Sequence, residues 1–251
     1  MLLQQTLSTL KTLKLTGMAQ ALEEQESQAI TQELAFTDRL TLLIDREVAN
    51  RDTKRLTRLL QLARLKHNAC MEDIDYRAKR GLDRSRTVSL GSCDWIRRGL
   101  PLLITGPTGV GKTWLACALA HQACRQGLTV RYLRVPRFLE ELRVAHSDGS
   151  FSKRLAALSK VDLLLMDDWA ISPITAGHRQ DLLELLDDRA GVRSTIITSQ
   201  LPVTAWHEYL GDPTVADAIL DRIVHAAHKI ELTGESLRKT RTKLTDREHS
   251  E

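Results

Sequence analysis

Aromatic residues are scarce in this chain, at 4% of its 251 residues, so its hydrophobic core must be built mainly from Leu, Ile, Val and Ala. The sequence has only four cysteines, no C-x-x-C pair and no histidine cluster with zinc-ligand spacing. We therefore expect reduced thiols rather than disulfides or a zinc site. No apolar run approaches the ~18 residues needed to span a bilayer, and the N-terminus lacks the pattern of a signal peptide. These absences predict a cytoplasmic protein that does not act on a membrane.

Residues 1–70 contain no proline and a single glycine, Gly17, a composition that favours helices. Apolar residues recur there every three to four positions, as one face of a helix requires. Leu40, Leu43, Ile44 and Val48 are one such set. We interpret residues 1–70 as a helical N-terminal domain that makes contacts with DNA or with other subunits.

A basic stripe runs along the end of this domain. Residues 46–66 carry seven Lys or Arg and two acidic residues, a local net charge of +5, whereas the whole chain has a formal charge of +4. At 100° per residue, the basic side chains fall opposite the apolar ones. The basic side chains on that face are Arg51, Lys54, Arg55 and Arg58. Such a face either contacts DNA phosphates or is merely solvated, and the composition leaves both interpretations open.

Residues 71–100 have mixed charge and are interpreted as a connector, with a loop and a short helical turn between Gly91 and Gly99. From residue 101, short apolar runs of strand type alternate with helical segments. The expected strands cover residues 101–105, 129–134, 161–166, 193–199 and 229–232. The expected helices cover residues 114–126, 136–146, 150–159, 178–189, 203–210 and 213–227. This alternation predicts an α/β fold with a five-stranded parallel sheet flanked by helices.

The segment after the first expected strand matches the phosphate-loop pattern G-x-x-x-x-G-K-[ST] and precedes a helix, the context that makes the match specific. It consists of Gly106, Pro107, Thr108, Gly109, Val110, Gly111, Lys112 and Thr113. The glycines let backbone N–H groups surround a phosphate, and the N-terminus of the helix adds partial positive charge. We expect Lys112 to reach the β- and γ-phosphates of ATP, and Thr113 to be a ligand of Mg²⁺.

Two acidic residues, Asp167 and Asp168, follow the third expected strand. Asp167 lies 55 residues after Lys112. Asp167 stands where a Walker B aspartate would hold Mg²⁺. Asp168 occupies the next position, where a carboxylate can polarise the water that attacks the γ-phosphate. Because a glutamate is commoner at that position, the shorter Asp168 is a departure from the usual pattern.

Several longer runs resemble the AAA+ ATPases of the IstB/DnaC type, a group that includes transposition helper ATPases of insertion sequences and bacterial helicase loaders. The runs are residues 164–169 (LLMDDW), 196–202 (IITSQLP), 220–223 (LDRI) and 230–238 (IELTGESLR). Residues 13–19 (LKLTGMA) resemble the start of the transposition helpers. The resemblance covers essentially the whole chain. It implies an AAA+ ATPase domain at residues 101–238 and a basic flexible tail at residues 239–251.

The resemblance also implies roles for residues outside these motifs. Gln200 matches the sensor-1 position, which detects the γ-phosphate, and Arg238 matches the sensor-2 position. Arg222 matches the arginine finger, which reaches the nucleotide of a neighbouring subunit and therefore implies a homo-oligomer. Residues 138–153 lie where this group carries a helical insertion used on DNA. The basic candidates are Arg137, just before this segment, and Arg143 and Lys153 within it, which are either phosphate contacts or ordinary exposed charges.

These observations lead to the hypothesis of an ATP-dependent DNA-binding helper of transposition. Hydrolysis of ATP would regulate its assembly on double-stranded DNA and the recruitment of the transposase of the same insertion sequence. A replicative helicase loader of the DnaC type shares this ATPase chemistry and is the alternative. Two further classes are a nucleotide-gated DNA-binding scaffold that barely hydrolyses ATP and a small-molecule kinase. The sequence offers no arginine-rich lid for a kinase.

Overall fold

The computed structural model describes residues 2–28, 31, 33–77 and 80–237. The chain forms two compact units, Met1–Arg58 and Leu59–Glu251. Across the described residues, no helix is both long enough and apolar enough to cross a membrane.

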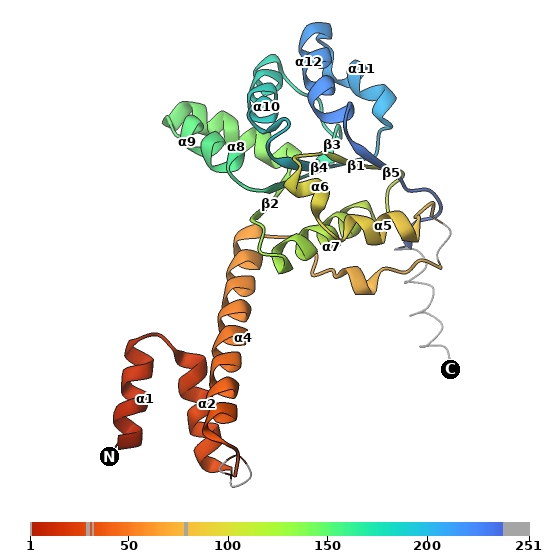
Figure 1. The fold of residues 1–251 in the computed structure, drawn as a ribbon. Coiled ribbons are helices and arrows are strands. Elements are labelled where there is room, and N and C mark those ends of the chain that lie inside the picture. The colour runs from red at the N-terminus through yellow and green to blue at the C-terminus, as the bar shows by residue number, and fades with distance from the viewer. Residues whose placement is uncertain (1, 29–30, 32, 78–79, 238–251) are drawn as a thin grey trace, which may run out of the picture. The chain divides into compact units, whose positions relative to one another are not determined.

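The first unit is helical, which confirms the prediction of N-terminal helices. It contains α1 (Leu2–Thr12), α2 (Thr16–Ser27) and most of α4 (Phe36–Ala63) (Figure 1). Glu47, buried on α4, accepts hydrogen bonds from the backbone N–H groups of Gly17 at 2.7 Å and Met18 at 3.2 Å. These donors belong to the first turn of α2, where the helix itself supplies no acceptors. Glu47 therefore caps α2 and fixes it against α4.

The second unit begins with the end of α4 and includes the segment expected to be a connector, residues 71–100. This segment contains a 3₁₀ turn, η1 (Met71–Asp73), and two short helices, α5 (Arg84–Leu90) and α6 (Asp94–Arg97). Helix α6 agrees with the helical turn expected between Gly91 and Gly99, whereas α5 is an addition. A local signal for α5 exists, because Asp83 caps it by accepting a hydrogen bond from the backbone N–H of Arg86 at 3.2 Å.

Five parallel strands form a single sheet in the order β2-β3-β4-β1-β5. The strands are β1 (Leu102–Thr105), β2 (Val130–Arg134), β3 (Leu163–Trp169), β4 (Ser194–Ser199) and β5 (His228–Glu231). The predicted five-stranded parallel sheet is confirmed, and its strand ends differ from the expected ones by at most three residues. Because all carboxyl ends of a parallel sheet share one edge, the loops that follow β1, β3 and β4 meet there.

Helices cover both faces of this sheet (Figure 1). Helix α7 (Lys112–Arg125) lies on one face. The other face carries six helical elements. They are α8 (Val135–Asp148), α9 (Phe151–Ser159), α10 (Ala176–Arg189), η2 (Val203–Ala205), α11 (Trp206–Leu210) and α12 (Pro213–Val224). Leu, Ile and Val dominate the core between these helices and the sheet, as the low aromatic content requires.

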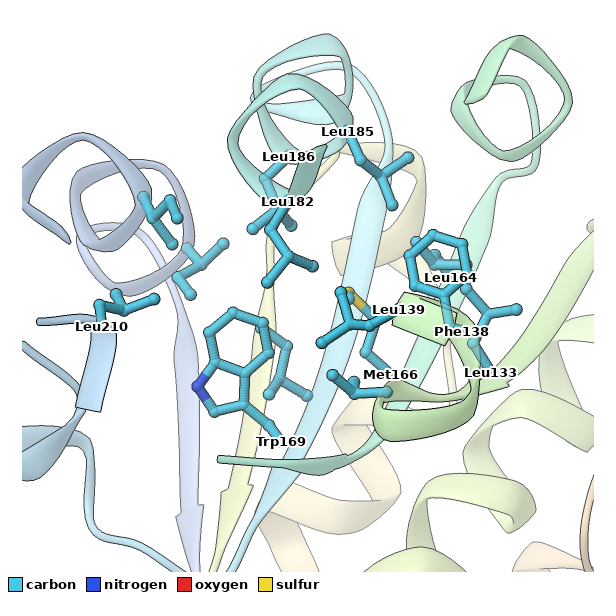
Figure 2. Close-up of a cluster of buried hydrophobic side chains, with 14 of the residues drawn as sticks. Leu133, Phe138, Leu139, Leu164, Met166, Trp169, Leu182, Leu185, Leu186 and Leu210 are labelled. Carbon is cyan, nitrogen blue, oxygen red and sulfur yellow. The ribbon is translucent and has the colours of Figure 1, made fainter. Parts of the chain in front are cut away.

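Trp169 is one of the few large aromatic side chains in that core. Figure 2 shows its indole beside Leu182 of α10 and Met166 of β3, in the middle of the buried cluster. It is 1% exposed, and its ring centroid lies 5.6 Å from that of Trp206 and 6.4 Å from that of Tyr209. The indole anchors the end of β3 to the helical layer, since burial of one such side chain contributes several kcal/mol (about 3–5 on truncation).

A β-bulge at the end of β3 decides which way its acidic residues point. Successive side chains of a strand alternate between faces, so Leu164 and Met166 enter the core while Asp167 faces α7. The register with β4 shifts between Met166 and Trp169, and Asp168 takes a left-handed conformation with φ of 61°. Trp169 thereby returns to the core face while Asp167 stays on the α7 face.

Candidate functional site

The loop between β1 and α7 has the curled conformation that its glycines permit. Gly106, Gly109 and Gly111 have φ values of 142°, 87° and 98°. Lys112 begins α7 and is 8% exposed. Its Nζ donates to the carbonyl oxygens of Gly106 at 2.7 Å and Pro107 at 2.8 Å. The ammonium therefore lies within the curl of the loop, where it can stabilise a phosphate group surrounded by the same backbone.

Asp167 lies at the end of β3, fully buried, and accepts polar contacts from four directions. Its Oδ1 accepts from Thr113 Oγ1 at 2.7 Å and from Thr198 Oγ1 at 2.5 Å. Its Oδ2 accepts from the Tyr132 hydroxyl at 2.8 Å, and Lys66 Nζ lies 3.4 Å away. Burial alone would raise the pKa of Asp167, but these hydroxyls and the Lys66 ammonium hold the pKa below its ordinary value. The carboxylate is therefore ionised at neutral pH and fixed beside Thr113.

The hydrogen bond between Tyr132 and Asp167 has the opposite effect on the pKa of Tyr132. Its side chain is partly buried, and its hydroxyl faces the negative charge of Asp167. Burial and that charge raise the pKa of Tyr132 above its ordinary value. The phenol stays protonated and donates to the carboxylate over the whole physiological pH range.

Asp168 follows in sequence but has a different partner. Its Oδ2 accepts from Arg134 Nε at 2.7 Å, and its backbone N–H donates to Thr198 Oγ1 at 3.3 Å. The Arg134 side chain is 55% exposed and that of Asp168 is 20% exposed. Thr198 thus contacts both acidic residues, and the Asp168 carboxylate lies nearer to solvent than that of Asp167.

Two further segments meet the phosphate loop. Gln200, directly after β4, accepts a hydrogen bond from Thr108 Oγ1 at 2.6 Å through its Oε1. The segment that follows β5 also lies on the loop, because the backbone N–H of Leu237 donates to the carbonyl oxygen of Gly109 at 3.0 Å. The fold therefore brings the predicted sensor-1 residue to the loop.

Arg222 is placed in the helical layer. On α12, its Nε donates to Asp187 Oδ1 of α10 at 2.5 Å and its Nη1 donates to the Ala218 carbonyl oxygen at 2.7 Å. Its side chain is 28% exposed. Arg238 and the basic tail at residues 239–251 lie outside the described residues.

The basic candidates of the first unit lie on exposed positions of α4. They are Arg51, Lys54, Arg55 and Arg58. Arg51 Nε donates to Glu47 Oε1 at 2.7 Å, and Lys54 Nζ donates to Thr16 Oγ1 at 2.7 Å. The stripe is thus exposed, and Glu47 compensates part of its charge.

The candidates on α8 and α9 have more compensated surroundings. Arg137 pairs with Glu141 at 3.0 Å and Arg143 pairs with Glu140 at 3.1 Å, both within α8. Lys153 is exposed on α9. Because each arginine has a carboxylate on its own helix, this surface offers less net positive charge to a phosphate backbone than α4 does.

Four groups around the two acidic residues were not singled out by the sequence motifs: Lys66, Tyr132, Arg134 and Thr198. Tyr132 and Thr198 carry a usable signal, because each is a hydroxyl-bearing residue of a strand and needs a hydrogen-bond partner where it is buried. Lys66 and Arg134 carry none, since only the order of the strands and the path of the chain bring them to β3.

Two solved structures resemble this chain over about two thirds of its length. The chain resembles DnaI with a TM-score of 0.57 and 23% identity, over 66% of this chain and 92% of DnaI. It resembles the DnaC helicase loader with a TM-score of 0.52 and 20% identity, over 65% of this chain and 97% of DnaC. The shared strand arrangement and the phosphate loop after β1 define a P-loop protein with the AAA+ fold.

Comparison of the amino-acid sequence with known families and proteins identifies the family within this class. The model of the IstB-like ATP-binding proteins matches residues 8–245, and the chain belongs to that family. It is 51% identical to the insertion sequence ATP-binding protein y4pL of Sinorhizobium fredii over 239 residues, which are 95% of this chain and 98% of the relative. It is 58% identical over 203 residues to the ATP-binding protein of insertion sequence IS1162 from Pseudomonas fluorescens, which covers 80% of this chain and 88% of the relative.

Proposed function

We propose that the chain binds ATP with Mg²⁺ at the phosphate loop, hydrolyses it, and uses this cycle to control its assembly on the target DNA of an insertion sequence. One observation carries the proposal: the buried, ionised Asp167 is hydrogen-bonded to Thr113, the residue that follows the phosphate-loop lysine. A buried carboxylate fixed beside a hydroxyl, at the N-terminus of a helix that favours phosphate, is suited to a metal–polyphosphate complex.

The residues present fit Mg²⁺. Thr113 Oγ1 and Asp167 Oδ1 are hard oxygen donors 2.7 Å apart, and Mg²⁺ prefers such ligands together with water and phosphate oxygens. When held by Thr113 and Asp167, the ion would neutralise charge that develops during phosphoryl transfer. Thr198 and Tyr132 hold the Asp167 carboxylate in place, so the protein reorganises little when the metal arrives.

The other groups divide the remaining work. Lys112 exchanges the carbonyl oxygens of Gly106 and Pro107 for the β- and γ-phosphates, which are stronger acceptors. Asp168 orients the attacking water once its carboxylate is free of Arg134, and Gln200 contacts the γ-phosphate from β4. Arg222 leaves Asp187 to reach the nucleotide of a neighbouring subunit, which makes hydrolysis dependent on oligomer formation.

DNA binding is assigned to the exposed basic face of α4, and Arg143 and Lys153 to a secondary contact. The insertion-sequence relatives support DNA and the cognate transposase as partners. The fold shared with DnaI and DnaC carries no such assignment by itself.

The first experiment measures nucleotide binding and turnover. Wild type is expected to bind Mg·ATP in calorimetry and to release phosphate faster with duplex DNA. Lys112→Ala should lose binding, since truncating one partner of a buried charge pair costs about 2–5 kcal/mol. Asp168→Asn should keep binding but lose single-turnover hydrolysis. A wild-type protein without Mg·ATP binding would refute the proposal. An already low rate that Asp168→Asn leaves unchanged would instead favour a nucleotide-gated scaffold.

The second experiment measures assembly. Sedimentation with ATP and duplex DNA should show a higher oligomer for wild type, which Arg222→Ala abolishes. Neutralising Arg51, Lys54, Arg55 and Arg58 should make DNA binding less dependent on salt. The negative slope of the logarithm of the binding constant against the logarithm of salt concentration should become shallower by about 0.9 for each lost phosphate contact. Retention by the cognate transposase supports a transposition role, whereas retention by a hexameric replicative helicase would replace it with helicase loading. A monomer under all conditions would contradict the assembly step.

A further inference from the structure

Arg80 is a buried cation in the segment that precedes α5. Its residue is 7% exposed, so it is more than nine-tenths buried. Its backbone carbonyl oxygen accepts from the N–H of Thr233, after β5, at 3.0 Å, and its Nη2 donates to the carbonyl oxygen of Asp75 at 3.0 Å. The backbone of Arg80 is thereby fixed between the segment before α5 and the chain that follows β5.

The guanidinium of Arg80 is aimed at the phosphate loop. A β-carbon placed on Gly111 would lie 2.9 Å from Arg80 Nη1, so the guanidinium lies directly against that glycine. Gly111 is the N-cap of α7, and Lys112 follows it. Arg80 thus lies beside the backbone that would hold the α- and β-phosphates of a nucleotide.

This position is electrostatically unfavourable unless an anion shares it. The N-terminus of α7 carries partial positive charge, and a cation at that end of a helix is destabilising. Arg80 Nε is buried without a hydrogen-bond partner, and within the described part of the chain no salt bridge joins Arg80 to a carboxylate. A buried donor without an acceptor and a buried charge without a counter-ion both cost free energy.

Arg189 shows what a buried arginine with a purely structural role looks like in the same unit. It is 1% exposed, and its guanidinium donates to Thr195 Oγ1 and to the carbonyl oxygens of Leu158, Val161 and Ser194. All three of its nitrogens have acceptors. Among the described residues, Arg80 has one acceptor for its guanidinium, although the two side chains are buried to a similar degree.

We propose that Arg80 is a phosphate ligand that contacts the α- and β-phosphates of the bound nucleotide from the side of Gly111. A polyphosphate supplies the acceptors that Nε lacks and reverses the unfavourable charge at the start of α7. This inference rests on the proposed binding of ATP. Because the α- and β-phosphates are present in both nucleotides, Arg80 contributes equally to ATP and ADP, whereas Lys112 reaches toward the γ-phosphate.

The test is calorimetric titration of the full chain with Mg·ATP and Mg·ADP, together with the melting temperature of the nucleotide-free protein. Arg80→Met, a neutral unbranched replacement, is expected to weaken both nucleotides about 10- to 100-fold, the range of a charge-assisted hydrogen bond. Its nucleotide-free melting temperature should equal or exceed that of wild type, because an unsatisfied cation has been removed. Arg80→Lys should recover part of the affinity for both nucleotides. Arg77→Met, an exposed neighbour on the same segment, should behave as wild type.

Several outcomes would overturn the proposal. Wild-type affinity in Arg80→Met would do so, and so would a loss for ATP without one for ADP. Failure of Arg80→Met to fold, or a lower nucleotide-free melting temperature, would mean that Arg80 is structural like Arg189. Arg80→Lys binding no better than Arg80→Met would exclude a charge contact. If Lys112→Ala loses affinity and Arg80→Met does not, this inference fails while the proposed function stands; if wild type binds neither nucleotide, both fail.

Discussion

The substitution Asp167→Asn tests whether the buried carboxylate is held ready for a metal. An amide oxygen can replace only one of the two carboxylate oxygens, and the other position becomes a donor. If the NH₂ group replaces Oδ2, it faces the Lys66 ammonium, which can only donate hydrogen bonds. The Tyr132 hydroxyl must then turn so that it accepts instead of donating. If it replaces Oδ1, both Thr113 and Thr198 must turn instead. Either arrangement loses charge-assisted hydrogen bonds.

The expected loss of stability follows from two opposing terms. Each hydrogen bond to a charged group contributes about 1.5–3 kcal/mol, but removing the charge also relieves the cost of burying it. The lowered pKa of Asp167 indicates that the hydrogen bonds outweigh the cost of burial. We expect a net loss of about 1–3 kcal/mol in the free energy of unfolding without nucleotide, or roughly 2–12 °C in melting temperature. All four tryptophans lie in the second unit, so their fluorescence reports its unfolding.

The effect has a defined pH dependence. A carboxyl whose folded pKa is lowered stabilises the protein fully above its unfolded pKa of about 3.9, and this contribution disappears as the pH falls through the folded pKa. The difference between wild type and Asp167→Asn in urea unfolding should therefore be constant above about pH 5 and shrink below about pH 4. A difference that grows on acidification would refute the sign of the argument.

The metal adds a second measurement to the same variant. At about 100 times its Kd, a ligand stabilises the folded state by about 2.7 kcal/mol, so wild type should melt higher with ATP plus Mg²⁺ than with ATP alone. Asp167→Asn should lose this metal-dependent increment. Asp162→Asn is the matched control, because Asp162 contacts Thr129 and Arg193 just before the same strand and should lose stability but keep the increment. Retention of the increment in Asp167→Asn would show that Asp167 is not a metal ligand.

Three further predictions concern separate features. Gly106→Ala should lower the free energy of unfolding by at least about 2 kcal/mol in urea titration, because its β-carbon would lie 2.0 Å from the Leu232 carbonyl oxygen; near-wild-type stability would contradict the close approach. Arg134→Ala should change stability by less than about 1 kcal/mol, since its ion pair with Asp168 is partly exposed, yet alter the rate of phosphate release; an unchanged rate would show that the pair does not restrain Asp168. Cys70 should be the thiol that reacts fastest with a disulfide reagent at pH 8, because burial raises the pKa of Cys93 to about 11 and of Cys124 to about 12 and also raises the pKa of Cys117; a fast reaction that persists in Cys70→Ser would contradict this order.

The individual strands and the phosphate loop could be predicted because their signals are local. A buried parallel strand is a short apolar run, and a phosphate loop needs glycine, lysine and threonine at fixed spacing within eight residues. The position of Asp167 at a strand end could be predicted for the same reason, since this residue directly follows an apolar run of β3. These predictions depend on neighbours in the chain and not on the packing of distant elements.

The β-bulge at Asp168 could not be predicted from such local patterns. Strict alternation along β3 would place residue 168 on the same face as Leu164 and Met166, inside the core, which a carboxylate cannot enter without a partner. The left-handed conformation of Asp168 resolves this conflict and lets Trp169 fill that position instead. Aspartate tolerates positive φ better than most residues, so the conflict itself was the available signal.

The side chains that donate to Asp167 were harder to predict, because each comes from a different part of the chain. Tyr132 and Thr198 come from β2 and β4, which are neighbours of β3 only because the sheet has the order β2-β3-β4-β1-β5. Lys66 comes from the segment after α4, 101 residues earlier in the chain. A buried carboxylate needs several donors to stay ionised, so one fully buried aspartate at a strand end implies such donors from the adjacent strands before any of them is identified. That inference turns a single acidic residue in a sequence into a search for hydroxyls at the same level of the flanking strands, and here it would have singled out Thr198 and Tyr132.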